Sequence, residues 1–494
     1  MCDYLFHLDP SNHESLQAQI RVQIVNAILE GHIKPGSALP SCRELAKQLS
    51  VSRNTVVLTY EKLVEDGFLY SKERSGYFVA KDFQPPILRD TTQPPKEKEG
   101  LDWQCRLIIH PNQQRNITKP HNWRDYPYPF IYGQLDHELF PLNEWRQCCR
   151  DANSKQAIQE WVTDSVDGDD EILLEQLHTR VLPTRGVWAN LDEILITMGT
   201  QNSLFLVSQL LISKGVTVGI EEPGYVDARN IFENSGAKLV PIPVDEEGLV
   251  IDARIAKCDI VYVTPSHQSP TTVTMSLDRR HSLLKKAREH NFVIIEDDYE
   301  SQAISLKKPI PAMKSLDRHD RVIYVSSMSK SFAPGLRLGY LVAPREFIEE
   351  ARTLRRLMLR HPPSNNQHTV ALFLARGYFD TLAHRLTRVY SDRRKLMQDA
   401  FEIYLSDTCA ATFGGTSFWV RGPSQLDSTK IATAAAKAGI LIEPGDIHFA
   451  TRNSPKNYFR LAFSSIQEDK IQPGLRALAK VIQDNIYTRE ALVS

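Results

Sequence analysis

Between residues 10 and 82 the apolar positions first follow a helical period. Positions three or four residues apart share one face of a helix, and the first such set is Leu16, Ile20, Ile24, Ala27 and Ile28. Gly31 and the pair Pro35-Gly36 are typical helix-ending residues and close this segment. The pattern therefore predicts one amphipathic helix near the start of the chain.

Two capped helices and a hairpin are predicted next. Ser41 and Glu44 have the spacing of a capping box, and Leu45 and Leu49 follow as inward positions. Ser52 is expected to cap a third helix. The buried face of that helix carries Val56, Tyr60, Leu63 and Val64, and Gly67 ends it. The runs 68–70 and 76–79 flank a charged turn and predict a β-hairpin. This order of elements is that of a winged helix-turn-helix.

A different pattern begins near residue 123, where short apolar runs alternate with amphipathic helices. The apolar runs are Ile194–Thr197, Val216–Ile220, Ile260–Val263, Phe292–Ile295, Val322–Val325 and Tyr340–Val342. A helical pattern follows Gln201, and another covers Leu277–His290. Such alternation predicts an α/β fold with a mostly parallel sheet, which binds ligands at the carboxyl ends of its strands.

Residues 83–122 separate the two patterns and lack a period of their own. They contain Pro85-Pro86, Pro94-Pro95 and the charged run Lys96–Glu99, which is typical of a semi-rigid linker. We therefore expect a DNA-binding type of domain at 10–82, a linker at 83–122 and a large α/β domain at 123–490.

Composition limits the class of protein. A chain of 494 residues with 42% apolar residues is long enough for two or more domains with sizeable cores. The net charge of −1 gives no overall attraction to nucleic acid, so a DNA contact would need a local patch. The seven cysteines have no metal-binding or redox spacing and fit reduced thiols of a cytoplasmic protein. We expect no signal peptide, no membrane span and no metal site.

A local patch occurs at the predicted third helix. Ser52, Arg53, Asn54 and Thr55 lie at its N-terminus, where a recognition helix meets base edges and phosphates. Ser41 and Arg43 would lie near the DNA backbone, and Arg74 and Gly76 on the wing. Residues 1–82 contain nine Lys and Arg against ten Asp and Glu, which leaves open a protein-interaction module with solvated charges.

The most informative residue of the large domain is Lys330. It follows the strand Val322–Val325 and a serine-rich turn with Ser327 and Ser329, and Arg337 comes seven residues later. A lysine at a strand end beside hydroxyls and an arginine suits a Schiff base with an aldehyde cofactor that carries a phosphate. The alternative is a surface lysine in a polar loop.

Other strand ends carry residues that fit the same cofactor. Gly199 and Thr200 open a helix, which suits a phosphate but is also common in simple capping. Tyr225 could stack on a planar ring or belong to the core. The acids of Glu296-Asp297-Asp298-Tyr299 end an apolar strand and need a partner, such as a pyridinium nitrogen, a metal ion or a helix N-terminus.

The first 82 residues resemble the GntR type of winged helix. The resemblance rests on Leu39–Ala46, on Val51–Val56 and on Leu63–Leu69. It implies binding to operator DNA.

Residues from about 125 to 485 resemble the fold type I pyridoxal-phosphate aminotransferases. The resemblance implies an internal aldimine at Lys330, a bond from Asp297 to the ring nitrogen, a contact of Tyr299 with the ring hydroxyl and stacking by Tyr225. It also implies phosphate contacts from Gly199, Thr200, Ser327, Ser329 and Arg337, and a substrate carboxylate at Arg460. One departure is Ser269-Pro270-Thr271-Thr272, where the family has Asn-Pro-x-Gly. The asparagine that touches the ring hydroxyl is absent, which puts turnover in doubt.

The fusion of both parts resembles the MocR type of GntR regulator, a homodimer with a winged helix-turn-helix, a fold type I domain and a smaller C-terminal α/β part. The runs Thr264–Gln268, Glu296–Glu300 and Ser329–Ser331 carry this resemblance. The runs Tyr128–Gln134 and Arg360–Gln367 are similar to regulators of ectoine and taurine catabolism. The resemblance implies a regulator that senses an amine or amino acid by aldimine exchange at Lys330. An active aminotransferase with a DNA-binding head and a protein-binding module without cofactor are the alternatives.

Overall fold

The computed structural model describes residues 8–9, 14–82, 101–133, 135–299, 310–328, 332–451 and 454–493. The chain divides into two compact units, Met1–Leu107 and Ile108–Ser494. The predicted linker extended to residue 122, whereas the structure assigns residues 108–122 to the second unit. The reason is contact along this segment: the Gln114 side chain donates to Glu233 at 3.1 Å, and Asn230 donates to the Arg115 carbonyl at 3.1 Å.

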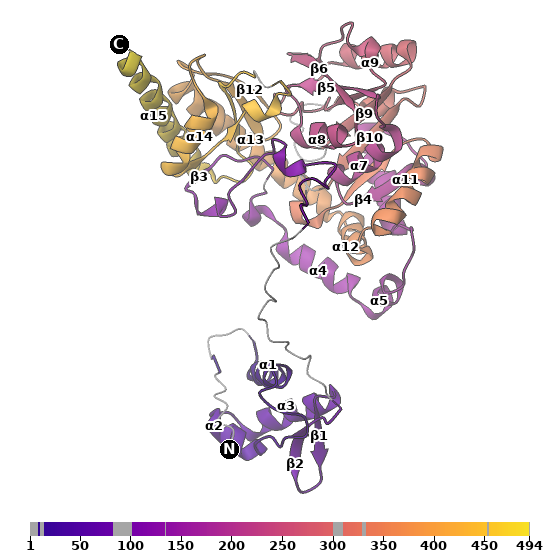
Figure 1. Ribbon diagram of the computed structural model, residues 1–494, viewed down its shortest axis with the longest axis vertical. Coiled ribbons are helices and arrows are strands. Elements are labelled where there is room, and N and C mark those ends of the chain that lie inside the picture. Colours follow the sequence, from indigo (N-terminus) through magenta and orange to yellow (C-terminus); the bar gives the residue numbers. More distant parts are fainter. Residues whose placement is uncertain are drawn as a thin grey trace. The chain divides into compact units, whose positions relative to one another are not determined.

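The first unit contains the predicted helices and hairpin in the predicted order (Figure 1). Its elements are α1 (Leu16–Leu29), α2 (Cys42–Gln48), α3 (Arg53–Glu65), β1 (Leu69–Lys72) and β2 (Gly76–Val79). The two strands pair antiparallel, with Leu69 opposite Val79. The predicted inward face of α1 is buried except at Leu16, which lies exposed in the first turn.

Serine side chains begin both helices of the helix-turn-helix. Ser41 Oγ accepts a hydrogen bond from the Glu44 amide at 3.3 Å, and Ser52 Oγ accepts one from the Thr55 amide at 3.1 Å. The buried Tyr60 donates its hydroxyl proton to the Pro40 carbonyl at 3.0 Å. The two serines start their own helices, and the Tyr60 bond joins α3 to the residue before the cap of α2. A core of mostly aliphatic side chains holds the helices together.

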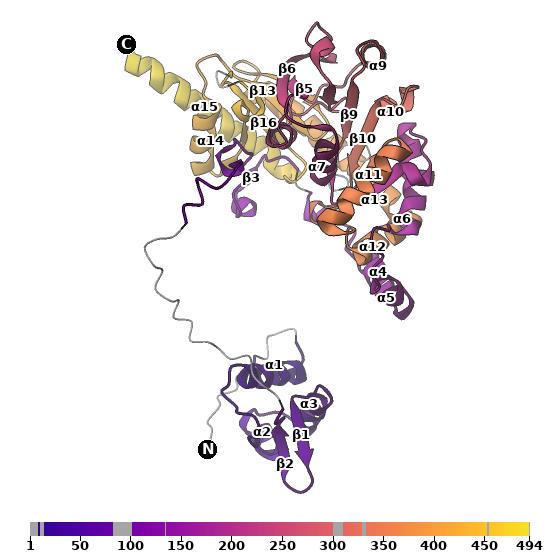
Figure 2. The ribbon, with the colours of Figure 1, turned by 45° about the vertical axis from the view of Figure 1, so that its right-hand side comes forward.

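The second unit is built on an eight-stranded sheet in the order β4-β11-β10-β9-β8-β5-β6-β7. Strands β6, β5, β9 and β10 of this sheet are labelled in Figure 2. Its strands are β4 (Ile194–Thr197), β5 (Thr217–Glu222), β6 (Lys238–Asp245), β7 (Gly248–Leu249), β8 (Ile260–Val263), β9 (Val293–Asp298), β10 (Val322–Ser327) and β11 (Gly339–Val342). The pairs from β10 through β9, β8 and β5 to β6 are parallel, while β11 and β7 run antiparallel to their neighbours. The prediction of an α/β fold with a mostly parallel sheet is confirmed.

Helices cover both faces of this sheet. Apolar side chains of α7 (Thr200–Leu211), α8 (Val226–Asn234) and α11 (Arg345–Leu359) pack on one face. Those of α9 (Leu277–His290) and α10 (Met313–Leu316) pack on the other. The remaining α-helices before the C-terminal part are α4 (Leu142–Ala152), α5 (Lys155–Trp161), α6 (Glu171–Gln176) and α12 (Ser364–Ala375).

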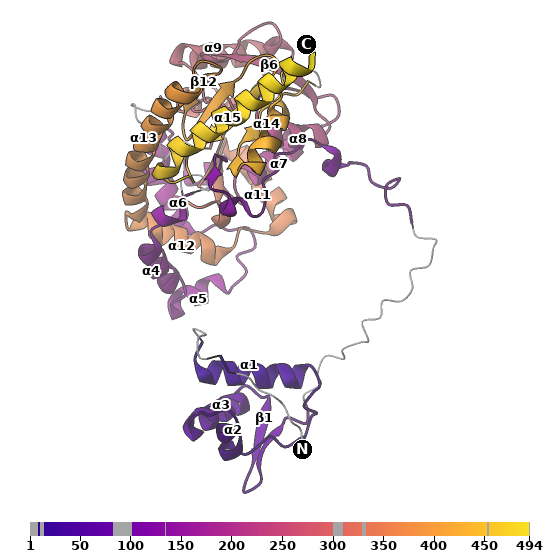
Figure 3. The ribbon, with the colours of Figure 1, turned by 90° about the vertical axis from the view of Figure 1, so that its left-hand side faces the viewer.

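The smaller C-terminal part has an antiparallel four-stranded sheet in the order β12-β13-β16-β15. Its elements are α13 (Tyr378–Tyr404), β12 (Ala410–Gly414), β13 (Ser417–Arg421), α14 (Ser428–Lys437), β14 (Ile440–Leu441), β15 (Glu443–Pro444), β16 (Tyr458–Ala462) and α15 (Glu468–Val493). The helices α13, α14 and α15 are labelled in Figure 3. The short β3 (Tyr128–Pro129) pairs with β14, which ties the start of the unit to its end. Within the described residues, no helix is both long and apolar enough to cross a membrane.

Candidate cofactor and effector site

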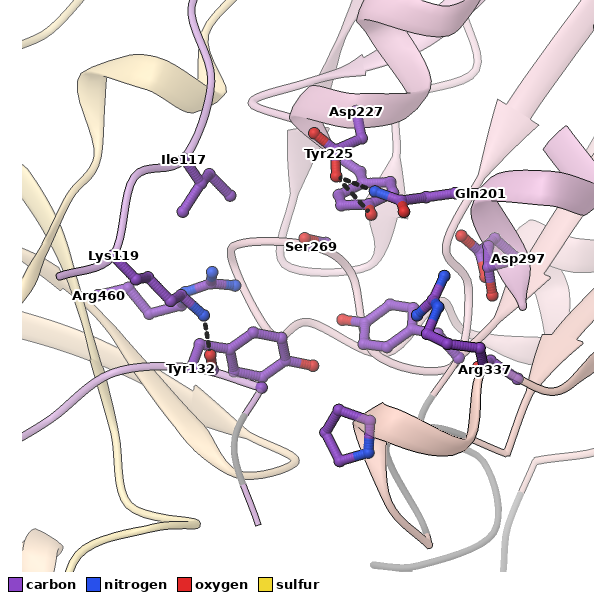
Figure 4. A pocket seen from close by; sticks show the side chains of 15 residues that line it. Ile117, Lys119, Tyr132, Gln201, Tyr225, Asp227, Ser269, Asp297, Arg337 and Arg460 are labelled. Carbon is purple, nitrogen blue, oxygen red and sulfur yellow. Dashed lines mark hydrogen bonds between the residues drawn. The ribbon is translucent and has the colours of Figure 1, made fainter. Parts of the chain in front are cut away.

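A cavity of about 390 Å³ lies where the strands of the parallel sheet end (Figure 4). Side chains that follow or end β4, β5, β8, β9 and β10 line it, together with residues from the start and the end of the unit. The lining residues are Ile117, Lys119, Tyr132, Gly133, Thr200, Gln201, Tyr225, Asp227, Ser269, Asp297, Tyr299, Ser327, Pro334, Arg337 and Arg460. The fold thus brings residues 117 and 460 to one site.

The three consecutive acids of β9 have different surroundings. Asp297 lines the cavity and accepts a hydrogen bond from the Tyr262 hydroxyl at 2.8 Å. Glu296 accepts from the amides of Met313 and Lys314, at 2.7 and 2.8 Å, at the start of α10. The acids belong to the strand itself, and neighbouring residues of a strand point to opposite faces of the sheet. Only Asp297 of the three therefore lines the cavity.

Asp298 forms a buried ion pair away from the cavity. Arg185 Nε lies 2.8 Å from Asp298 Oδ2, and Tyr324 donates its hydroxyl proton to the same oxygen at 2.7 Å. Burial favours the protonated form, but the charge of Arg185 and these bonds hold the pKa of Asp298 below its usual range. Burial and the nearby charge of Asp298 raise the pKa of Glu296 to about 7. This part of the acid run is structural.

The turn after β4 forms a corner suited to a phosphate group. Gly199 has φ +88°, and a Cβ there would lie 3.1 Å from Arg337 Nη2. Arg337 donates from Nη2 to the Met198 carbonyl at 3.1 Å. Among the described residues, the buried Thr200 Oγ1 has no hydrogen-bond partner, and it begins α7, where backbone amides attract anions. A hydroxyl donor, an arginine and a helix N-terminus together fit a phosphate.

Two tyrosines, Tyr225 and Tyr299, belong to the wall of the cavity. Tyr225 donates its hydroxyl proton to Asp227 at 3.0 Å, and Gln201 also donates to Asp227, at 2.6 Å. Burial, followed by the charge of Asp227, raises the pKa of Tyr225 well above its ordinary value. Tyr299 donates its hydroxyl proton to the His267 carbonyl at 2.8 Å.

The turn that carries Ser269 is fixed by a buried polar network. Gln268 donates to Glu221 at 3.1 Å and accepts from the Thr271 amide at 2.9 Å. Thr264 donates its hydroxyl proton to Glu221 at 2.5 Å, and the Ser269 amide donates to Thr264 at 3.1 Å. Because Glu221 is fully buried, its pKa is raised to about 7. The network presents Ser269 to the cavity where the sequence pattern of the aminotransferases has asparagine.

Arg460 lies at the end of the cavity opposite Asp297 and Arg337 (Figure 4). Its Nε and Nη2 lie 2.7 and 2.6 Å from Glu443 Oε2, and its guanidinium stacks on the Tyr132 ring at 4.0 Å. Lys119 Nζ lies 3.2 Å from the other Glu443 oxygen and also donates to the Tyr132 carbonyl. The charge of Glu443 raises the pKa of Arg460, against the effect of burial.

Sequence reasoning missed Lys119, Tyr262 and Glu443. Lys119 belongs to the segment predicted as linker, and Glu443 is opposite Arg460 across the β15–β16 ladder. No spacing in the sequence links these positions. Of the predicted cofactor residues, Thr200, Tyr225, Asp297, Tyr299, Ser327 and Arg337 line the cavity. Lys330 and Ser329 lie outside the described residues.

The predicted DNA-binding residues lie on the surface of the first unit. Arg43, Arg53 and Asn54 are exposed, as is the wing residue Arg74. Thr55 is half-buried, and Ser41 and Ser52 use their hydroxyl oxygens as helix caps. Gly76 has φ +103° at the start of β2, a conformation that favours glycine.

Two family models match the chain. The model described as bacterial regulatory proteins, gntR family, covers residues 16–79. The model described as aminotransferase class I and II covers residues 134–478. The two matches correspond to the two units of the structure.

Two transcriptional or catabolism regulators are similar to this chain along nearly its full length. The HTH-type transcriptional regulator TauR of Rhodobacter capsulatus is 40% identical over 481 residues, which covers 97% of this chain and 99% of TauR. The probable rhizopine catabolism regulatory protein MocR of Rhizobium meliloti is 29% identical and covers 95% of this chain and 93% of its own.

Solved aminotransferases share the fold of the second unit. The α-aminoadipate aminotransferase LysN of Thermus thermophilus, complexed with N-(5'-phosphopyridoxyl)-L-leucine, has a TM-score of 0.71 and 25% identity over 78% of this chain and all of its own. The kynurenine aminotransferase of Pyrococcus horikoshii, in complex with PMP, has a TM-score of 0.68 and 27% identity over 74% of this chain and 95% of its own.

These matches identify the cofactor and the family. The phosphate corner and the carboxylate of Asp297 fit pyridoxal phosphate, which is the cofactor of this chain. The chain belongs to the MocR type of GntR-family transcriptional regulators, which join a helix-turn-helix DNA-binding domain to a class I and II aminotransferase domain.

Proposed function

We propose that this pyridoxal-phosphate-dependent regulator senses a small amine that also carries an acid group. One observation carries the proposal: Arg460 stands at one end of a single cavity, and Asp297 and Arg337 stand at the other (Figure 4). A molecule that spans this cavity could bring its amine to the cofactor while an arginine binds its acid group.

The lining of the cavity and the resemblance to aminotransferases support the following cofactor-binding roles. Asp297 holds the ring nitrogen, Tyr299 contacts the ring hydroxyl and Tyr225 stacks on the ring. In the absence of effector, Lys330 would hold the cofactor through its aldehyde. The phosphate is held by Gly199, Thr200, Ser327, Ser329 and Arg337.

The chain's own residues then position the effector. Pyridoxal phosphate supplies an aldehyde that reacts with primary amines and a ring that withdraws electrons from the bond formed. Arg460 would bind the acid group of the effector and so direct its amine toward the cofactor and Lys330. Differential binding of the effector to two arrangements of the protein would shift the population that binds DNA. Our candidates are taurine and an ectoine-derived diamino acid.

The DNA-binding role belongs to the first unit. Arg53, Asn54 and Thr55 at the start of α3 contact base edges, and Ser41, Arg43 and Ser52 contact the phosphate backbone. Arg74 and Gly76 form the wing. We expect a cytoplasmic homodimer, because two heads related by a two-fold axis would match two operator half-sites.

An aminotransferase with a DNA-binding head is the second candidate, and the aminotransferase fold favours it. The replacement of the ring-contacting asparagine by Ser269 argues against efficient turnover. Amine binding depends on Lys330 and Asp297, which are present, whereas later proton transfers need a finely adjusted ring. We therefore expect effector binding with little product formation.

Absorbance titration of the cofactor-loaded protein tests this function. Taurine and L-2,4-diaminobutyrate are the probes, and ethanolamine is the control because it has an amine but no acid group. We expect a saturable spectral change with at least one acid-bearing probe, a much weaker response to ethanolamine, and an altered operator affinity at the same effector concentration. Sustained product formation with a keto acid would instead identify an enzyme.

A further inference from the structure

The segment that leads from the DNA-binding head into the second unit also lines the cavity. Ile117 and Lys119 contribute to its wall, although the rest of the wall comes from residues 132 to 460. Upstream of them, Arg115 donates to the Asp446 carbonyl at 3.1 Å, and Gln114 donates to Glu233 at 3.1 Å. We call residues 108–122 the entry segment.

Lys119 attaches the entry segment to the acid-binding end of the cavity through one carboxylate. Glu443 accepts from Lys119 on Oε1 at 3.2 Å and from Arg460 on Oε2 at 2.6 and 2.7 Å. The Tyr132 amide donates to Oε1 at 3.2 Å. Since these bonds occupy Nε and Nη2 of Arg460, a ligand's acid group would meet the guanidinium at its Nη1 edge.

This cluster has two cations and one anion. The charges of Arg460 and Lys119 outweigh the effect of burial on Glu443 and lower its pKa to about 2, so the carboxylate stays charged. The adjacent His448 is buried near Arg460, and its pKa is lowered to about 3, so it stays neutral. One positive charge is therefore in excess. The side chains of Glu443 and Arg460 are only 6% and 4% exposed, so solvent screens this pair weakly, while the side chain of Lys119 is 26% exposed.

We propose that Lys119 sets the charge preference of the effector site and couples effector binding to the entry segment. This inference rests on the proposed function. An effector with a single acid group balances the excess charge of the cluster. The added anion also attracts Lys119 and holds the entry segment more firmly against the cavity. Coupling between two binding sites is reciprocal. The factor by which effector binding changes operator affinity therefore equals the factor by which operator binding changes effector affinity.

Charge variants separate the two parts of this proposal. Lys119→Met removes the excess charge, and Glu443→Gln doubles it. The double variant restores one excess charge but has no Lys119–Glu443 bond. Lys286→Met is the matched control, because Lys286 is a surface lysine of α9 that pairs with Glu289 at 2.7 Å, away from the cavity.

Three measurements are made on each full-length, cofactor-loaded variant with taurine as the probe. They are the dissociation constant from absorbance, amide hydrogen exchange of the entry segment, and the ratio of operator affinities with and without taurine. We expect Lys119→Met to weaken taurine binding roughly ten-fold. In this variant taurine should neither slow amide exchange of the entry segment nor change operator affinity, whereas in wild type it should do both. The double variant should regain taurine affinity, but taurine should still neither slow amide exchange of its entry segment nor change its operator affinity. L-Glutamate is an amine with two acid groups. The ratio of the taurine to the L-glutamate dissociation constant should be roughly ten-fold larger in Glu443→Gln than in wild type.

The possible failures are distinguishable. The coupling role is wrong if wild-type protein binds taurine and taurine still changes operator affinity and slows amide exchange of the entry segment in Lys119→Met. If the double variant binds taurine as weakly as Lys119→Met, excess charge does not set the affinity. If wild-type protein responds to neither taurine nor L-2,4-diaminobutyrate, the proposed function itself fails and this inference fails with it. Should Glu443→Gln not fold, as seen by circular dichroism, Lys119→Met still decides the coupling.

Discussion

Replacing Arg185 with methionine tests the division of the acid run of β9 into a cofactor-facing residue and a structural one. Arg185 Nε lies 2.8 Å from Asp298, and its Nη2 donates to Ser266 at 2.8 Å. Both charged side chains are almost completely buried, with 4% and 0% exposed. Methionine fills much of the same volume but leaves Asp298 with the hydroxyls of Tyr324 and Ser266 and no ion-pair partner.

Removal of one member of a buried ion pair typically destabilises a protein by about 3–5 kcal/mol. We expect the free energy of unfolding of Arg185→Met to fall by this amount near neutral pH. Without Arg185, burial raises the folded-state pKa of Asp298 above its unfolded value, so the proton that it binds stabilises the folded variant. The difference in free energy of unfolding between wild type and Arg185→Met should therefore shrink as the pH falls from about 8 to about 5.

Urea denaturation followed by tryptophan fluorescence measures this effect mainly in the second unit, because five of the six tryptophans lie there, between residues 123 and 419. The double variant Arg185→Met, Asp298→Asn is the control, since it removes both charges and should recover part of the loss. A deficit below about 1 kcal/mol, or one that grows as the pH falls, would refute the reasoning.

Four further predictions address the remaining parts of the molecule. Arg53→Ala should weaken operator binding by about 1–3 kcal/mol in a gel-shift titration at fixed salt with an unchanged cofactor spectrum, and an unchanged affinity would move the base contacts elsewhere. Asp297→Asn should reduce cofactor affinity by about 1.5–3 kcal/mol, measured by absorbance after dialysis, without loss of the fold; full retention of cofactor would contradict its role at the ring nitrogen. The pKa of Glu443 falls from 4.5 to about 2 on folding, so its contribution is complete above pH 4.5 and is lost as the pH drops toward 2. The stability difference between wild type and Glu443→Gln should shrink over that range in urea denaturation, and a difference independent of pH would be inconsistent with the ion pair. The full-length protein should sediment as a dimer in analytical ultracentrifugation, and a monomer that binds operator normally would argue against two-fold recognition.

The sequence predicted those elements that depend on local pattern. The helix Leu277–His290 has the predicted bounds, and the strand Ile260–Val263 does too. Both have strong signals: a capping serine precedes the helix, and a continuous apolar run forms the strand. The strand ends near Thr200, Tyr225 and Asp297 could be found for the same reason, because parallel strands bring their carboxyl ends to one edge.

The acid-binding end of the cavity could not be predicted in this way. Lys119 is separated from Glu443 by more than 300 positions, and its neighbours are prolines and polar residues without a period. Only the folded second unit, in which β15 pairs with β16, brings Glu443 opposite Arg460. Long-range charge pairs of this kind have no local signature, so a residue in an apparent linker became part of the site.

The most direct test of the central claim compares operator affinity of wild type and Lys330→Ala, both loaded with pyridoxal phosphate, with and without taurine or L-2,4-diaminobutyrate at fixed salt. We predict that at least one amine changes the operator affinity of wild type several-fold and that Lys330→Ala binds operator but shows a markedly altered amine response. An identical response in both proteins, or none in wild type despite a saturating spectral change, would contradict the account that amine binding at the cofactor controls the DNA-binding unit.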